Sequence, residues 1–134
     1  MENKQIRINS IRKSDGDTEK SVSTALCKLH KLKDTISVFY KEKLDDNTFV
    51  NTKINAKKDE VEIIRTGEYA VRMVYKKGME TEFSYNTPYG IMPAKIKTDN
   101  IKMVFLGESI QISMNYHMSF FGVESDNDIK IDIF

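Results

Sequence analysis

Phe83-Ser84-Tyr85-Asn86-Thr87-Pro88-Tyr89-Gly90 combines alternating aromatic residues with a proline and a glycine near its end. Successive side chains of a strand point to opposite faces, so one face should collect the odd-numbered residues Phe83, Tyr85, Thr87 and Tyr89. Pro88 cannot donate a ladder hydrogen bond, and Gly90 tolerates a sharp change of direction. The segment therefore predicts a strand that ends at a corner of a sheet or barrel.

The same period of two continues on both sides of this corner. Apolar and polar residues alternate without a break over 110–120, and shorter alternating runs begin at Ile6 and end at Ile133. A change in the parity of the apolar residues predicts a bulge near Asp99-Asn100. Besides these runs, the pattern predicts strands at 19–32, 35–43, 48–55, 60–66, 70–76, 80–88 and 93–105.

The segment Thr18–Leu32 allows two interpretations. Val22, Leu26 and Leu29 have a spacing that a helix could also use. Val22, Thr24 and Leu26 alternate as well, and the neighbouring segments are strongly strand-like. A strand is therefore the prediction for this segment.

Short turn sequences separate the predicted strands. They are Asp15-Gly16-Asp17, Asp45-Asp46-Asn47, Lys57-Lys58-Asp59, Lys77-Gly78 and Gly107-Glu108. Eight to ten antiparallel strands joined in this way form either a sandwich or an up-and-down barrel. The barrel is favoured because hairpin follows hairpin without a long crossover, and because closure removes exposed sheet edges.

Composition restricts the class of protein. The 134 residues fit one domain over 1–134, and 21 Lys and Arg against 20 Asp and Glu give a net charge of +1. Such a balance gives no reason to expect nucleic acid or an anionic membrane as a partner. Cys27 is the lone cysteine, the first residues lack the apolar core of a signal peptide, and no apolar run approaches the roughly 20 residues of a membrane span. We expect a cytoplasmic protein.

The chain resembles a known family in short sequence motifs that are spread over Ile6 to Ile131. These motifs are Gly67 after Arg65, the Gly78 hairpin, Phe83-x-Tyr85-x-Thr87-Pro88-Tyr89-Gly90, Lys97-Thr98 and Ile112-x-Met114-x-Tyr116. In these the chain resembles the YwiB-like family of uncharacterised bacterial proteins. The resemblance implies a calycin-like, lipocalin-like antiparallel barrel in a bacterial cytoplasm, and it implies no activity. Ala25-Leu26-Cys27-Lys28 departs from the pattern, where a glycine and an aromatic pair are expected.

The sequence contains no clear motif of a catalytic site or a metal site. His117 should face solvent, and a strand would place Cys27 and His30 on opposite faces, so the spacing of a zinc site is missing. No nucleophile elbow and no glycine-rich phosphate loop occurs. We expect no metal, no cofactor and no enzyme activity.

The interior of the barrel is the first candidate for a binding site. Nine aromatic residues could either line a cavity or fill it: Tyr40, Phe49, Tyr75, Phe83, Tyr85, Tyr89, Phe105, Tyr116 and Phe120. Arg65 shares the parity of Val61 and Ile63, so its charge should enter the barrel or its mouth and needs a partner there. That partner is Glu42 or Glu82, solvent at the rim, or an anionic ligand.

Two functions follow as hypotheses. In the first, the barrel binds a small apolar or anionic ligand in its lumen through Arg65, Tyr40, Tyr85 and Tyr116. In the second, the lumen is filled and a lysine-bearing outer surface contacts a protein or RNA, although the near-zero net charge makes nucleic acid the less favoured partner. The lysines concerned are Lys28, Lys31, Lys33, Lys41, Lys43, Lys53, Lys57, Lys58, Lys76 and Lys77. A monomer and a homodimer are both compatible with the sequence.

Overall fold

A computed structural model describes residues 1–44, 47–67 and 70–134, the side chain of Thr87 excepted. Within these ranges ten antiparallel strands form one sheet that curls into a nearly closed barrel, so the predicted calycin-like all-β class is confirmed. The strands are β1 (Glu2–Ser14), β2 (Asp17–Leu32), β3 (Thr35–Lys43), β4 (Phe49–Lys57), β5 (Glu60–Thr66), β6 (Val71–Lys76), β7 (Glu80–Thr87), β8 (Gly90–Leu106), β9 (Ser109–Phe120) and β10 (Val123–Ile133).

The strand order is β6-β5-β4-β3-β2-β1-β10-β9-β8-β7, so neighbours in sequence are neighbours in space and β1 pairs with β10. The open seam lies between β6 and β7. There the Gly78 N–H donates to the Thr98 carbonyl at 2.8 Å, and the Thr98 N–H donates to the Met79 carbonyl at 3.2 Å. These bonds link the β6–β7 turn to β8, and the barrel is nearly rather than fully closed.

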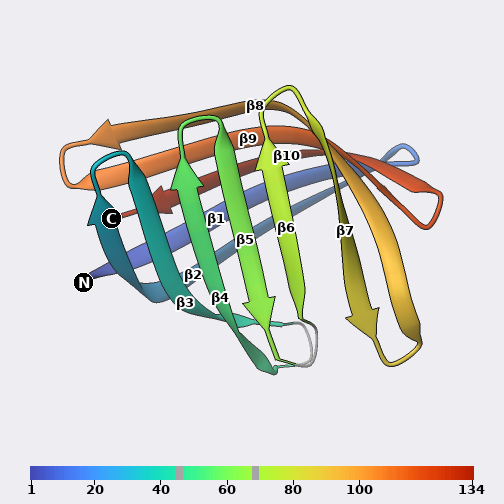
Figure 1. Ribbon diagram of the computed structural model, residues 1–134, viewed down its shortest axis with the longest axis horizontal. Helices are drawn as coiled ribbons and strands as arrows, with labels where there is room; N and C mark the ends of the chain where they lie inside the picture. The colour runs from blue at the N-terminus through green and yellow to red at the C-terminus, as the bar shows by residue number, and fades with distance from the viewer. Residues whose placement is uncertain (45–46, 68–69) are drawn as a thin grey trace.

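Two long strands turn the corners between the layers of the barrel. In Figure 1, β3 to β6 cross in front of a layer made by β1, β2, β8, β9 and β10. β2 pairs with β1 from Asp17 to Leu29 but with β3 only from Cys27 onward. β8 pairs with β7 in its first part and with β9 in its second. Each corner strand therefore belongs to both layers.

The less certain sequence interpretations are also resolved. Thr18–Leu32 lies in a strand, since tertiary pairing with β1 and β3 outweighs its weak helical spacing. The predicted bulge is confirmed by a register shift between Thr98 and Asn100. The predicted turn at Asp45-Asp46-Asn47 falls partly outside the described residues.

Hairpin turns use the backbone conformations that the sequence anticipates, with one exception. Asp15 and Gly16 have φ of 50° and 81°, as a two-residue type I′ turn requires. Phe121 and Gly122 form a second turn with φ of 54° and 70°, which the sequence did not reveal because phenylalanine is an unusual residue in the left-handed region. This turn fixes the register between β9 and β10.

The corner at Phe83–Gly90 is a hairpin turn between β7 and β8. Phe83 is buried, and the ring of Tyr85 packs edge-on against Phe83 and Phe120 with centroids 5.3 and 5.4 Å away. Tyr89 is 92% exposed and leaves the face that alternation predicts, because it lies in the turn rather than in a strand.

Side chains from every strand fill the interior. Those of lowest exposure include Ile6, Leu29, Ile36, Val38, Ile54, Val61, Tyr75, Ile96, Ile110, Ile112, Ile131 and Ile133. Met73 and Met114 are buried among them, while Met103 and Met118 pack at the border of the core. The period of two in the sequence thus maps directly onto the inner face of the barrel.

Candidate functional site

The predicted lumen residues begin with a row across four strands. The register places Cys27 beside Tyr40, Tyr40 beside Thr52, and Thr52 beside Arg65, all on the inward face. The Arg65 guanidinium donates to Glu42 through Nε at 2.6 Å and Nη2 at 3.1 Å. Burial by itself would lower the pKa of Arg65, but the hydrogen bonds and charge of Glu42 outweigh it and raise that pKa. Of the partners considered from sequence, Glu42 is the one present.

The three tyrosines predicted to bind a ligand, Tyr40, Tyr85 and Tyr116, pack against other side chains of the protein. Tyr116 is buried with its ring 4.9 Å from that of Tyr75, and Tyr40 is buried beside the Arg65–Glu42 pair. Burial, and then the charge of Glu42, raises the pKa of the Tyr40 hydroxyl. Tyr85 is partly buried at the aromatic corner described above. The ligand-binding role of Arg65, Tyr40, Tyr85 and Tyr116 stays a prediction.

Three members of the predicted aromatic set lie elsewhere. Phe49, Tyr89 and Phe105 are exposed, so they do not line the lumen. Phe105 instead has the Lys31 ammonium 4.9 Å above its ring on the outer surface.

A groove lies on the outer side of the same four strands. One wall is the cross-strand row Lys28, Phe39, Lys53 and Ile64. The opposite wall is formed by Leu26, Lys41, Asn51 and Thr66, and between them run the backbones of Cys27, Tyr40 and Thr52. We call this feature the transverse groove because it crosses the strands from β2 to β5. Three strand spacings make it about 14 Å long.

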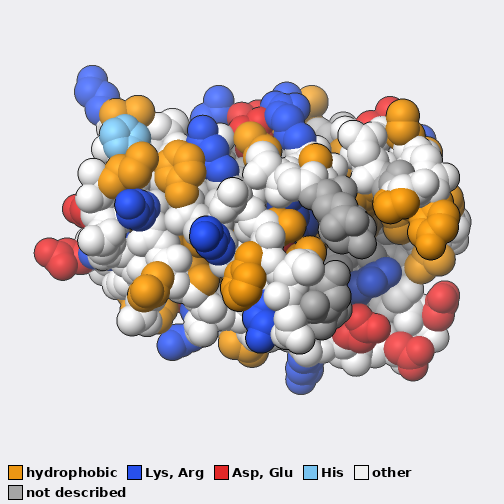
Figure 2. All heavy atoms as spheres, turned by 90° about the horizontal axis from the view of Figure 1, so that it is seen from below, with side chains coloured by type: hydrophobic (Ala, Val, Ile, Leu, Met, Phe, Trp, Pro, Cys, Tyr) orange, Lys and Arg blue, Asp and Glu red, His pale blue; other side chains and the backbone are white. Residues whose placement is uncertain are grey.

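The transverse groove has apolar side chains in both walls, Leu26, Phe39 and Ile64, and lysines beside them. Its volume is about 680 Å³, within the range of small-molecule sites, and Asn3 and Lys4 of β1 complete its lining. The Lys53 ammonium lies 5.3 Å from the centroid of the Phe39 ring. Figure 2 shows how lysine and arginine side chains alternate with apolar ones over one half of the face it presents.

The charge of the groove is unbalanced. Its lining contains Lys4, Lys28, Lys41 and Lys53 but no aspartate or glutamate. In the part of the chain that the structure describes, none of these lysines has a carboxylate oxygen within 4.0 Å. The Lys4 ammonium does donate to the Glu108 carbonyl at 3.3 Å. The groove can therefore offer its other ammonium groups to an anion.

The sequence indicated Lys28, Lys41 and Lys53 as surface lysines but not the apolar side chains that lie between them in the groove. A signal was present in the doubled apolar pairs Leu26-Cys27, Phe39-Tyr40 and Ile63-Ile64. In a strand with one buried face, one member of such a pair must point outward, and here the outward residues are Leu26, Phe39 and Ile64. Only the strand register places the three outward members in one groove.

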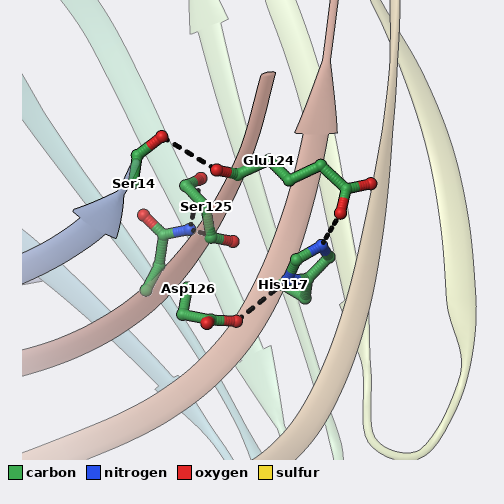
Figure 3. Close-up of polar contacts among 6 residues, drawn as sticks. Ser14, His117, Glu124, Ser125 and Asp126 are labelled. Carbon is green, nitrogen blue, oxygen red and sulfur yellow. Dashed lines mark hydrogen bonds and ion pairs between the residues drawn. The ribbon is translucent and has the colours of Figure 1, made fainter. Parts of the chain in front are cut away.

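A second polar cluster surrounds His117 on β9. Its Nδ1 lies 2.8 Å from Asp126 and its Nε2 lies 3.1 Å from Glu124, both on β10 (Figure 3). The hydrogen bond to Asp126, and then that to Glu124, raises the pKa of His117. The Ser14 hydroxyl donates to the Glu124 carbonyl at 2.8 Å rather than approaching the ring. Because both ring nitrogens face carboxylates, this cluster is an ion network rather than a nucleophile and base.

We also examined whether metal-ligating side chains lie close together in the described part of the chain. Cys27 is buried and His30 exposed on opposite faces of β2, as the strand interpretation expects. Across the described ranges, no group of three or more His, Cys, Asp or Glu side chains could hold a metal ion. The same ranges contain no helix able to cross a membrane.

Comparison with known proteins supports the fold and the family. The family model "Domain of unknown function (DUF1934)" matches residues 6–133. The crystal structure of the ywiB protein from Bacillus subtilis is similar, with a TM-score of 0.83 and 21% sequence identity over 96% of this chain and 89% of that chain. At that identity the likeness concerns the fold. No curated protein matches the chain.

Proposed function

Because the chain belongs to the DUF1934 family, whose function is unknown, we propose a function from its own geometry: non-catalytic binding of a small amphipathic anion in the transverse groove. The ligand would carry an apolar body and a carboxylate or phosphate head. The observation that carries the proposal is a set of lysines that surround apolar side chains and that, within the described residues, have no carboxylate oxygen within 4.0 Å. This moves the hypothetical ligand from the lumen to the outer surface.

The inner and outer sides of the strands differ in what a ligand could gain. Inside, an anion would compete with Glu42 for Arg65 and would have to separate packed aromatic rings. Outside, Phe39, Ile64 and the alkyl stems of the lysines offer apolar contact, and Lys41 and Lys53 lie on opposite walls. A head group between these two ammonium groups would exchange water for two charge-assisted contacts.

Decanoate titrated into isotopically labelled protein tests the proposal. Amide shifts in the NMR spectrum should concentrate at Phe39, Lys41, Lys53 and Ile64. Decyltrimethylammonium, which has the same tail and a positive head, and acetate, which has a head without a tail, should both bind much more weakly. Each removes one of the two features that the groove matches.

Charge removal provides the matched control. The double variant Lys41→Gln, Lys53→Gln should weaken decanoate binding about tenfold or more, as loss of two charged contacts implies. Lys102→Gln, Lys130→Gln removes the same charge from exposed positions on β8 and β10 and should leave binding unchanged. Equal weakening by both pairs, or shifts centred on Arg65 and the lumen tyrosines, would contradict the outer site.

Single-stranded RNA is the remaining alternative from the lysine-bearing surface. Oligouridylate in the same titration distinguishes it, since lysines with an aromatic residue can also bind a phosphate backbone and a base. Binding of the oligonucleotide, but not of decanoate, with loss in the Lys41, Lys53 variant would replace the small anion by RNA.

A further inference from the structure

The outer edge of β2 between Asp17 and Leu26 is open. β2 pairs with β1 over this whole segment, whereas its pairing with β3 begins at Cys27. Among the described strands, β1 and β3 are the only ones that pair with β2. Main-chain N–H and C=O groups along this edge therefore face solvent and could pair with another chain.

A second open edge, in the later part of β8, is built differently. Pairing of β8 with β7 ends at Lys97, and a bulge between Thr98 and Asn100 follows directly. Lys31 then covers the ring of Phe105. Bulges and lysines are the devices by which proteins prevent edge strands from joining.

The β2 edge lacks a comparable bulge. Its register with β1 is continuous from Ser14 opposite Asp17 to Glu2 opposite Leu29, and the segment contains no proline. It also exposes apolar side chains on its outward face, with Val22 66% and Leu26 80% accessible. A regular edge with exposed apolar residues is a favourable surface for strand addition.

We propose that two copies of this chain pair antiparallel through the β2 edge and form a dimer with one continuous sheet. In such a pair the two-fold axis stands normal to the sheet and sets residues of the same parity opposite each other. An axis at Val22 uses Thr18–Leu26, which is nearly all of the open edge. Because the contact is isologous, assembly stops at two copies.

The charges of the segment allow this pairing with itself. With the axis at Val22, Lys20 lies opposite Thr24 of the second copy and Glu19 lies opposite its Ala25. Val22 meets Val22 of the second copy, a β-branched pair of the kind that stabilises sheets. No like charges are directly opposed, whereas an axis at Lys20 would set two lysines against each other. A second copy is therefore the occupant that fits this edge.

Sedimentation velocity of the full chain tests the dimer. The unmodified protein should sediment as a dimer, and Val22→Lys should raise the dissociation constant about tenfold or more by opposing two lysines. Val123→Lys, at another exposed valine on a strand of the same layer, is the matched control and should leave the dimer intact. A protein that stays monomeric at every concentration overturns the proposal, as does equal weakening by both variants.

Disulfide trapping locates the axis. Directly opposite residues of an antiparallel pair have Cα atoms about 4.5–5.5 Å apart, which a disulfide can span. Val22→Cys in a Cys27→Ala background should therefore cross-link rapidly on oxidation, and Val123→Cys in the same background should not. Cross-linking of the Val123→Cys protein alone would overturn the β2 interface. Leu26, at the end of the interface, also lines the transverse groove, but Val22 does not, so a cross-link at Val22 reports on the strand pairing and not on ligand binding.

Discussion

The two faces of strands β2 to β5 differ in whether their cationic side chains have carboxylate partners. On the inner face the one guanidinium, Arg65, is held by two hydrogen bonds to Glu42. On the outer face Lys28, Lys41 and Lys53 surround an apolar groove, and none of them has a carboxylate partner among the described residues. A charged side chain inside a barrel needs a partner of opposite charge, because water does not solvate it there. A charged side chain on the surface is solvated and can therefore remain unpaired until a ligand binds. This difference is our reason for proposing a binding site on the outer face.

Removal of the inner charge should have the largest effect on stability. Arg65→Ala leaves Glu42 without its partner in a largely buried setting, and we expect a loss of about 2 kcal/mol in the free energy of unfolding. The value is below that for a fully buried pair because both side chains keep some solvent contact. Urea denaturation measures it. Glu42→Gln added to Arg65→Ala should recover part of the loss, and a loss equal to that of an exposed lysine variant would contradict the comparison.

Removal of a buried hydroxyl group on the inner face should increase the stability of the protein. Thr52 is 3% exposed, and in the described part of the chain its Oγ1 has no hydrogen-bond partner. Thr52→Val keeps the shape and removes the buried polar atom, so stability should rise by about 1 kcal/mol. Thr66→Val is the control, because its hydroxyl is exposed and donates to Asn51. A stability loss in Thr52→Val would show that the hydroxyl is satisfied after all.

The His117 cluster predicts a pH dependence on the outer surface. The folded state raises the pKa of His117 above its usual value of 6.5, so its contribution to stability is complete below pH 6.5. It is then lost as pH rises through the folded pKa. The side chain is solvated, and the change should be below about 0.5 kcal/mol. The free energy of unfolding, measured by denaturation at a series of pH values around and above 6.5, should depend less on pH in His117→Gln than in the unmodified protein. An equal effect of His30→Gln would show that the pH dependence does not come from the His117 cluster.

The smallest expected effect concerns the outer lysines. Lys53→Gln should change the free energy of unfolding by less than about 0.5 kcal/mol, because its ammonium contributes mainly a cation–π contact with Phe39 in exposed surroundings. Thermal unfolding of the single variant beside Arg65→Ala measures the contrast. A loss as large as that of Arg65→Ala would make the lysine a structural residue and remove it from the groove's binding role.

The positions of the strands could be predicted from the sequence because each strand has one buried face and therefore an alternating pattern. Alternation at 110–120 and turn residues such as Asp15-Gly16 are local signals, and both are confirmed. The Phe121-Gly122 turn was missed because a phenylalanine with positive φ contradicts residue preference. That turn pairs His117 with Asp126, so the ion network was missed with it.

The sequence by itself determined the all-β class, the strand positions, the bulge near Asn100 and the inward direction of Arg65, since each depends on a period of two or on a local backbone preference. Tertiary structure decided which carboxylate neutralises Arg65, and it brought Leu26, Phe39 and Ile64 into one groove. It also decided that the edge of β2 stays open. These features depend on register between strands, and register is a property of the assembled sheet rather than of any one segment.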